Sequence, residues 1–344
     1  LSKQRPIFLK VNDSTSLDFT HREDAYSDFD REKLIPYQVG DRGPAVAIGD
    51  LNGDGKDDIF FGGSKFIASQ IFMQTDSSFV KSKIHTIQND SINEEVAAVI
   101  ADFNKNGAND LFTATAGGDF SNKSKPLLDA LYLNNKSEFI RANLPQLFEN
   151  TSVLAVHDYD ADGDLDVFVG SQSITGSFGK LPTSYLLENK NGSFAIAQEF
   201  KELGMVTSAI WDDFDGDSKK DLIVTGEWMH PIFLKNTGDK LVKQDKIKGD
   251  LYGLWQSIIA FDIDHDGDTD YVLGNWGENS KFKASDEFPM LMYYSDFDAN
   301  GQTETLVVTE KNESYYPLLG LDALASQLVN LRKKYSTYKS FAGQ

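Results

Sequence analysis

Acidic side chains recur at a fixed spacing in six short stretches of this 344-residue chain. Each stretch follows the pattern Asp-x-(Asp/Asn)-x-(Asp/Asn)-Gly-x-x-(Asp/Glu), with Ser in place of Gly in one copy. Calcium is a hard cation that takes roughly six to eight oxygen ligands. Side-chain oxygens at positions 1, 3, 5 and 9 and a carbonyl at position 7 can converge on such an ion when the intervening residues turn away. The pattern therefore predicts up to six calcium sites.

The predicted ligands are the side chains at positions 1, 3, 5 and 9 of each stretch. They are Asp50, Asn52, Asp54 and Asp58; Asp102, Asn104, Asn106 and Asp110; Asp158, Asp160, Asp162 and Asp166; Asp213, Asp215, Asp217 and Asp221; Asp262, Asp264, Asp266 and Asp270; and Asp296, Asp298, Asn300 and Glu304. The stretches at Asp158 and Asp262 have Asp at all four positions, so we expect them to bind calcium most tightly. If any site is empty, we expect it to be the Asn-containing stretch at Asp102 or the stretch at Asp296, which closes with Glu.

The position of the last ligand indicates what the ions do. The calcium loop of helix–loop–helix sensors starts in the same way but closes with Glu at position 12. Closure at position 9 between strands predicts structural ions instead. Asp- and Gly-rich turns without a metal are the alternative, but 23 of the 53 acidic residues lie in these stretches and would repel one another without cations. Magnesium is a weaker candidate, since it rarely accepts a cage of protein ligands alone. Ser218 at the glycine position of the fourth stretch predicts a strained turn.

Short apolar runs position these stretches. In the first five copies one run precedes the stretch and another follows it, as in PAVAIGD and DIFFGG. A third run comes next, and a fourth follows a polar turn in the first four copies. The runs are rich in β-branched and aromatic residues, which predicts strands. A four-strand unit of about fifty residues predicts an all-β fold, a β-propeller of four-stranded blades with calcium loops.

Five such units can be recognised. In the fifth, residues 289–295 are interpreted as the third strand and the stretch at Asp296 as the turn between the third and fourth strands. We divide the chain into an N-terminal segment, 1–43, that could add a closing strand or partial blade, a propeller, 44–319, and a C-terminal helical segment, 320–344. In the last segment, apolar residues at spacings of three and four predict one amphipathic helix over 320–335. They are Leu321, Leu324, Leu328, Leu331 and Tyr335.

The acidic stretches and their flanks resemble FG-GAP/VCBS repeats, the units of integrin α-chain-like propellers, most clearly in GPAVAIGDLNGDGKDDIFFGG. The stretches GNWGENSKF, DFDANG and YYPLLGLDALASQLVNLRKKY resemble the cartilage-acidic-protein-like group of bacterial FG-GAP proteins, common in Bacteroidetes. The resemblance covers nearly the whole chain. It implies an exported, calcium-stabilised propeller at the cell surface or outside the cell, associated in some cases with the outer membrane. Because integrin-like propellers usually have seven blades, it also implies that the five readable blades are completed to about seven.

Composition excludes several classes of function. The formal net charge is −20 and there is no cysteine. The charge disfavours nucleic acids and anionic lipid surfaces as partners. The absence of cysteine excludes disulfides, thiol nucleophiles and thiolate-bound zinc. No apolar run approaches the roughly 18 residues that a transmembrane helix requires.

The sequence offers no catalytic signature, and its five histidines lack the spacing of a zinc site. We therefore assign no catalytic residue. A speculative ligand site for a sugar or an extended peptide comprises Trp228, Trp255, Trp276, Asn275 and Asn279, with packing between blades as the alternative for the rings. The leading hypothesis is a non-enzymatic binding or scaffold module that engages a protein partner or a polysaccharide at the bacterial surface. A polysaccharide lyase or hydrolase, and a subunit of an outer-membrane complex, are the alternatives.

Overall fold

Each acidic loop closes a β-hairpin in the structure, a computed structural model that describes residues 10–120, 123–245, 249, 251–277 and 279–342. The paired strands are β1 (Val46–Gly49) and β2 (Asp58–Phe61), β5 (Glu94–Ala101) and β6 (Asp110–Ala116), β9 (Asn150–His157) and β10 (Asp166–Ser173), β13 (Met205–Asp212) and β14 (Asp221–Met229), β17 (Gly253–Phe261) and β18 (Asp270–Asn275), and β19 (Leu291–Ser295) and β20 (Glu304–Lys311). In all six, the residue before position 1 pairs with the residue at position 9. The nine-residue loop thus sets one register for every hairpin.

Two further strands extend each of the first four hairpins to a four-stranded antiparallel unit, and we call these units blades one to four. Blades one to three are separate sheets, whereas blade four shares a six-stranded sheet with β17 and β18. The added strands are β3 (Gln70–Gln74) and β4 (Phe79–Ser82), β7 (Ala130–Asn134) and β8 (Phe139–Arg141), β11 (Ser184–Lys190) and β12 (Ser193–Phe200), and β15 (Ile232–Asn236) and β16 (Leu241–Gln244). Short polar turns join them, because Asn, Gly and Asp accept the tight conformations that apolar strand residues avoid. The strands expected for these four units are confirmed.

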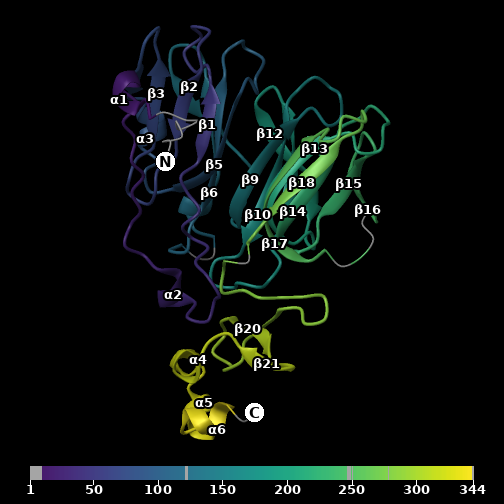
Figure 1. The fold of residues 1–344 in the computed structure, drawn as a ribbon. Coiled ribbons are helices and arrows are strands. Elements are labelled where there is room, and N and C mark those ends of the chain that lie inside the picture. Colours follow the sequence, from purple (N-terminus) through teal and green to yellow (C-terminus); the bar gives the residue numbers. More distant parts are fainter. Residues whose placement is uncertain (1–9, 121–122, 246–248, 250, 278, 343–344) are drawn as a thin grey trace, which may run out of the picture.

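The hydrophobic core lies between neighbouring blades, which stand side by side in chain order (Figure 1). Phe60 and Leu111 belong to the cluster between blades one and two, Phe112 and Val167 to the next, and Phe168 and Leu222 to the cluster between blades three and four. The first strands β1, β5, β9, β13 and β17 contact one another in that sequence. Within the described residues, no comparable contact joins β17 or β18 back to β1.

The fifth unit differs from the prediction. Its hairpin β17–β18 pairs through β17 with the end of β14, but β18 has no strand on its other edge within the described residues. The predicted third strand, residues 289–295, contributes β19 instead to a separate three-stranded sheet with β20 and β21 (Ser314–Pro317). The interpretation of the sixth loop as a turn between third and fourth strands is therefore wrong. The hairpin itself keeps the register of the others, since Ser295 pairs with Glu304, but its strands pack elsewhere. Met292 lies against the buried cluster of Tyr37 and Phe178, and Thr305 Oγ1 donates to the carbonyl of Phe178.

The N-terminal segment forms no strand between residues 10 and 43, and residues 1–9 lie outside the described part of the chain. It contains the short helices α1 (Asn12–Thr15) and α2 (Asp28–Arg31) and runs along blade one before β1 begins. After α2 its chain turns inward, and Ile35, Tyr37 and Val39 are buried in an aromatic cluster with Trp276 and Phe282. These long-range contacts hold the segment in place without strand pairing, so the closing strand considered for it does not form between residues 10 and 43.

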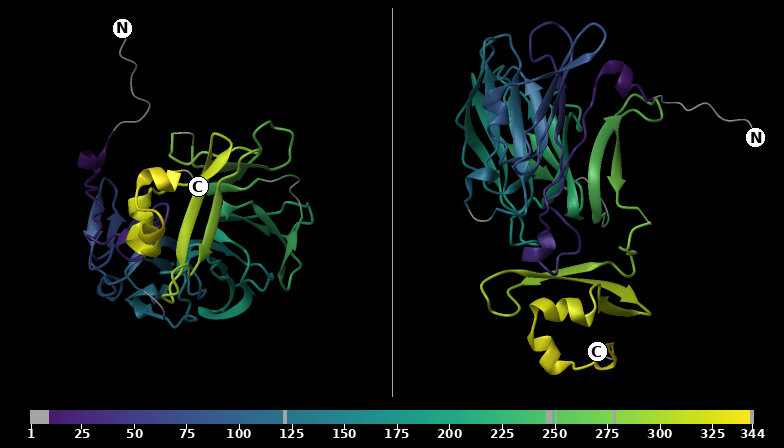
Figure 2. Two further views of the ribbon diagram at one scale, coloured as in Figure 1. Left: turned by 90° about the horizontal axis from the view of Figure 1, so that it is seen from below. Right: turned by 90° about the vertical axis from the view of Figure 1, so that its left-hand side faces the viewer.

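The C-terminal elements form a small lobe below the blades (Figure 2). The single helix predicted over 320–335 is instead two helices, α4 (Leu321–Gln327) and α5 (Asn330–Lys334), followed by α6 (Tyr338–Ala342). The chain leaves the helical conformation at Leu328, whose ψ is 72°, and the β-branched Val329 that follows is a weak helix former. The remaining short helices are α3 (His85–Gln88) and the 3₁₀ helix η1 (Lys125–Leu127). None of the helices in the described part of the chain has both the length and the apolar composition to span a bilayer.

Candidate metal centres

Carboxylate oxygens converge at positions 1, 3 and 9 in four of the six loops. One oxygen from each of the three residues lies within 4.8 Å of the other two in the sets Asp158, Asp160 and Asp166; Asp213, Asp215 and Asp221; Asp262, Asp264 and Asp270; and Asp296, Asp298 and Glu304. At an effective dielectric constant of about 20, two like charges at this separation repel by about 3.5 kcal/mol or more, and by less where water screens them. A divalent cation at the centre would remove this repulsion.

Main-chain N–H groups shape each loop around its first residue. In all six loops the position-1 carboxylate accepts a hydrogen bond from the N–H of position 6, at 2.7–3.1 Å. Position 6 has a positive φ in every loop, including Ser218 at 69°. The strained turn predicted at Ser218 is confirmed, since its backbone lies in the left-handed region that favours glycine. Position 4 is also left-handed in all six loops, which the sequence pattern did not reveal.

Position 5 has a different role from positions 1, 3 and 9. Its side-chain oxygen accepts the N–H of position 7 in every loop, at 2.7–3.1 Å. These residues, such as Asp162 and Asp266, are not among the acidic clusters that converge within 4.8 Å. Their assignment as ligands stays a prediction, whereas the structure brings positions 1, 3 and 9 together.

The position-9 carboxylate joins the loop to the sheet. Asp166 accepts the N–H of Tyr159 at 3.1 Å through Oδ2 and the N–H of Asn189, in the third strand, at 2.8 Å through Oδ1. It is fully buried, and this burial raises its pKa to about 7. Asp110 in blade two has the same two kinds of partner and a pKa raised by burial to about 6. A bound cation would favour the ionised form of both groups.

Several oxygens in the clusters accept no hydrogen bond from the described residues. Asp158 Oδ1 and Asp298 Oδ1 are buried from solvent and accept no hydrogen bond. A buried ionised oxygen without a partner is costly, because it has lost water without a replacement. Oxygen ligands of this kind suit calcium, so the residues present fit the predicted ion.

A repeated asparagine links each loop to the blade before it. Asn189 Nδ2 donates to the carbonyl of Phe103, at position 2 of the preceding blade's loop, at 2.8 Å, and to the carbonyl of Leu165 at 3.0 Å. Asn134 and Asn236 make the same two kinds of bond in blades two and four. Sequence reasoning missed these residues. The signal was an Asn that ends the third apolar run in three consecutive units.

A comparison with protein families finds a known repeat in the part of the chain that contains the third to fifth loops. The model of the FG-GAP-like repeat matches residues 158–224 and 213–273. The chain contains FG-GAP-like repeats. Each matched stretch begins at position 1 of one loop and ends in the strand that follows the next loop, so it spans one blade junction. No curated protein matches the chain.

The first two acidic loops, which lie outside the matched residues, have fewer acids at the converging positions, since Asn52 and Asn104 occupy position 3. Asn52 Oδ1 accepts the N–H of Asp54 at 2.9 Å, and Asn104 Oδ1 accepts that of Asn106 at 3.1 Å. A metal at these loops would meet fewer negative charges than one at Asp158. The order of affinity predicted from the sequence stays a prediction.

Among the described residues, one acidic cluster lies outside the six acidic loops. Oxygens of Glu23, Asp41 and Glu94 are within 4.8 Å of one another. Burial, with the nearby charge of Glu23, raises the pKa of Glu94 to about 8. A proton bound to Glu94 can therefore relieve the repulsion in this cluster near neutral pH.

Four of the five residues of the speculative ligand site have partners within the described chain. Trp228 Nε1 donates to the hydroxyl of Tyr37 at 2.9 Å, and the ring of Trp276 lies 4.8 Å from that of Tyr37. Trp255 Nε1 donates to the carbonyl of Leu251 at 3.1 Å. Asn275 Oδ1 accepts the N–H of Leu254, while Asn279 is exposed. Their role in binding a ligand stays a prediction.

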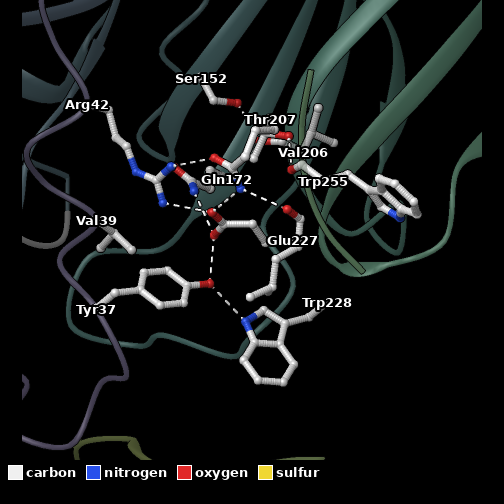
Figure 3. A network of polar contacts seen from close by, with 12 residues as sticks. Tyr37, Val39, Arg42, Ser152, Gln172, Val206, Thr207, Glu227, Trp228 and Trp255 are labelled. Carbon is white, nitrogen blue, oxygen red and sulfur yellow. Dashed lines mark hydrogen bonds and ion pairs between the residues drawn. The ribbon is translucent and has the colours of Figure 1, made fainter. Parts of the chain in front are cut away.

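Glu227 is the centre of a buried polar network that joins the N-terminal segment to three strands (Figure 3). Its carboxylate accepts hydrogen bonds from Tyr37, Arg42, Gln172 and Gln256 at 2.8–2.9 Å. The carboxylate is fully buried, and Arg42 supplies the compensating charge. Sequence analysis did not single out these residues, because their contacts span up to 190 positions of the chain.

Proposed function

We propose that this chain is a calcium-stabilised binding or scaffold module that is exported and engages a protein partner or a polysaccharide at the cell surface. The observation that carries the proposal is the repeated convergence of carboxylates at positions 1, 3 and 9 of the FG-GAP-like loops. Ions at these places lie inside hairpins whose strands are already paired. Their expected effect is to stiffen the sheets.

The blade junctions support a scaffold role. The Asn-to-carbonyl bonds connect the loop of each blade to the next blade. Metal binding at one loop would therefore also hold the neighbouring sheet in place. A rigid array of sheets presents a surface whose shape does not depend on its ligand, which reduces the entropic cost of binding.

The wider assignment extends the family resemblance. We propose that the blades belong to an integrin-like propeller whose ring is completed to about seven blades. We also propose that the chain belongs with the cartilage-acidic-protein-like group of exported proteins from Bacteroidetes, on the stretches 274–282, 296–301 and 315–335 that resemble that group.

Thermal unfolding with and without metal tests the calcium part. The melting temperature should rise with calcium concentration and fall after chelation with EGTA, while magnesium at equal concentration should stabilise less. Native mass spectrometry of the protein should then count the bound ions. An unchanged melting temperature in excess chelator, with no bound calcium in the mass spectrum, would exclude the calcium-stabilised module.

Binding and location need separate measurements. Fractionation of the source cells should place the chain in the surface or extracellular fraction. The calcium-loaded protein should retain a polysaccharide or protein from that surface, and lose it when EGTA unfolds the loops. A chain that stays in the cytoplasmic fraction would contradict the proposed location.

A further inference from the structure

The outer edge of β18 is an unused strand-pairing site within the described chain. In blades one to four, the strand after the acidic loop pairs on both edges, with the strand before the loop and with a third strand. β18 follows its loop in the same register but pairs only with β17. Its second edge therefore presents main-chain N–H and C=O groups without a sheet partner, a natural template for an added strand.

The four complete blades show how the equivalent edge is occupied. The residue at position 10 pairs with an antiparallel third strand in the pairs Ile59 with Phe72, Leu111 with Tyr132, Val167 with Leu187, and Leu222 with Leu234. Two residues later that third strand donates a main-chain N–H to the position-9 carboxylate, at 2.7–2.8 Å. In the fifth unit, Asp270 accepts the N–H of Ile263, but no third-strand N–H from the described residues reaches it.

Apolar side chains of the fifth unit are exposed on the face that a following blade covers elsewhere. Phe112 and Phe168, at position 11 of their units, are buried against the next blade, and Ile223 at this position of blade four is 0% exposed. Val272, at the same position of β18, is 42% exposed, and Ile259 and Phe261 on the adjacent β17 are also exposed, because no blade of the described residues follows β18. This open apolar face adjoins the unpaired edge and offers a surface to the apolar residues of an added strand.

The loop next to this edge predicts the charge of the added strand. In blade four, Lys235 of the third strand pairs with Asp215 and, at 3.1 Å, with Asp217. The fifth loop has Asp264 and Asp266 at the same positions, and no ion pair from the described residues reaches either of them. A strand with a basic residue just before its Asp-binding N–H would match this site.

We propose that the outer edge of β18 binds an extended segment of a partner protein, antiparallel to Tyr271–Leu273, with apolar residues at alternate positions and a basic residue beside the fifth loop. This inference deepens the proposed binding function and rests on it. Main-chain hydrogen bonds would supply affinity and the alternating side chains specificity, as in other cases of strand addition. The bound segment would pair with β18 in the register that the third strand has in the four complete blades.

A second copy of the chain is a poorer occupant. The runs of this chain that match the required pattern, such as Ile232–Asn236, already lie inside complete blades. The run at 289–295 is held in its own hairpin by the sixth loop. A copy would have to open one of these sheets to donate a strand, whereas a segment of another protein would not.

A synthetic peptide with the sequence of residues 231–244 tests the site, because it copies the third and fourth strands of blade four. Binding of the fluorescent peptide to the full chain, in excess calcium, is followed by anisotropy. Peptides N-methylated at alternate residues serve as probes of main-chain pairing. One alternate set should lose binding by at least about tenfold while the other set retains it, because only every second N–H faces the sheet.

Two variants of the chain locate the contact. Val272→Asp should weaken peptide binding by at least about tenfold, because it places a charge in the pairing surface beside the acidic loop. Val80→Asp, at an exposed valine on the outer strand of blade one, is the matched control and should bind as the parent does. A peptide with Glu in place of its Lys at the position of Lys235 should also bind more weakly.

Three results would overturn the inference. They are no peptide binding, binding that both sets of N-methylated peptides retain equally, and self-association of the chain that Val272→Asp abolishes, since that would make a second copy the occupant. The melting temperature in calcium and in EGTA is measured on the same samples. Failure of peptide binding with calcium stabilisation intact would reject this strand site alone, whereas loss of both would reject the proposed module.

Discussion

The side-chain amide of Asn189 lies across the junction between blades two and three, 2.8 Å from the carbonyl oxygen of Phe103. Its main-chain N–H also binds Asp166, at position 9 of its own loop. One residue thus connects a candidate metal loop to the loop of the neighbouring blade. Local strand propensity does not require this contact, which depends on the way adjacent sheets pack.

Asn189→Ala should reduce the free energy of unfolding by about 2–3 kcal/mol. The variant leaves the carbonyls of Phe103 and Leu165 without their side-chain donor, and unpaired buried carbonyls are costly. Urea denaturation in calcium measures the change. Asn330→Ala, at an exposed position in α5, is the control and should change stability by less than about 0.5 kcal/mol. Equal small effects for both variants would contradict a role for the asparagine at the blade junction.

Asp160→Asn should weaken calcium binding at the third loop without abolishing folding. It removes one of three converging carboxylates, so one ion in the native mass spectrum should be lost at limiting calcium. For a single site, calcium at about 100 times its dissociation constant stabilises a fold by about 2.7 kcal/mol, which sets the size of the expected loss. Asp76→Asn, at an acid exposed in the turn after β3, should leave the ion count unchanged. Equal ion counts for Asp160→Asn and the parent would remove Asp160 from the ligand set.

Ser218→Gly should stabilise the chain by about 0.5–1 kcal/mol. Ser218 has a φ of 69°, in a region where a side chain is unfavourable, although glycine also raises the entropy of the unfolded state. The reverse change, Gly163→Ser at the same position of the third loop, should destabilise it. Thermal unfolding in calcium compares the two. Shifts of the same sign in both variants would show that position 6 does not govern loop stability.

Glu95→Gln should flatten the pH dependence of stability between about pH 4.5 and 8. Burial raises the pKa of Glu95 to about 8, and its Oε2 accepts the N–H of Gly63 at 2.6 Å. Because the folded state holds this proton more tightly than the unfolded state, the stabilisation is complete below pH 4.5 and is lost as pH rises through 8. The loss amounts to at most about 1.4 kcal/mol per pH unit.

The measurement for Glu95 is the difference in unfolding free energy between parent and variant across that pH range, which cancels the titration of the other acids. Relative to the variant, the parent should lose stability steadily as pH rises. A difference that does not change with pH would contradict a raised pKa for Glu95.

Arg42→Ala should destabilise the chain by about 3–5 kcal/mol. It leaves the fully buried carboxylate of Glu227 without its charged partner. The double variant Arg42→Ala/Glu227→Gln should recover part of the loss, because the uncompensated charge is gone. Urea unfolding of the single and double variants gives the coupling energy. No recovery in the double variant would show that the two charges contribute independently.

Local sequence by itself determined the six acidic loops, the hairpins that they close and the strands of the first four blades. The physical reason is that each loop sets the register of its own two strands through contacts within nine residues. Over 289–295 the expected strand and its hairpin did form, but in a separate sheet and not in the fifth unit, because the loop sets the register of its own two strands and not the sheet that they join.

Tertiary structure decided the remainder. The repeated asparagine is visible in the sequence, but its partner across the junction, Phe103 in the case of Asn189, is not. The network around Glu227 likewise joins residues up to 190 positions apart. The predicted helix ends before Leu328. Only its first part packs on the rest of the chain, since Leu321, Leu324 and Ala325 in α4 are buried and no residue of α5 is. Burial of polar groups demands a partner, and which partner lies within reach depends on the packing of whole sheets.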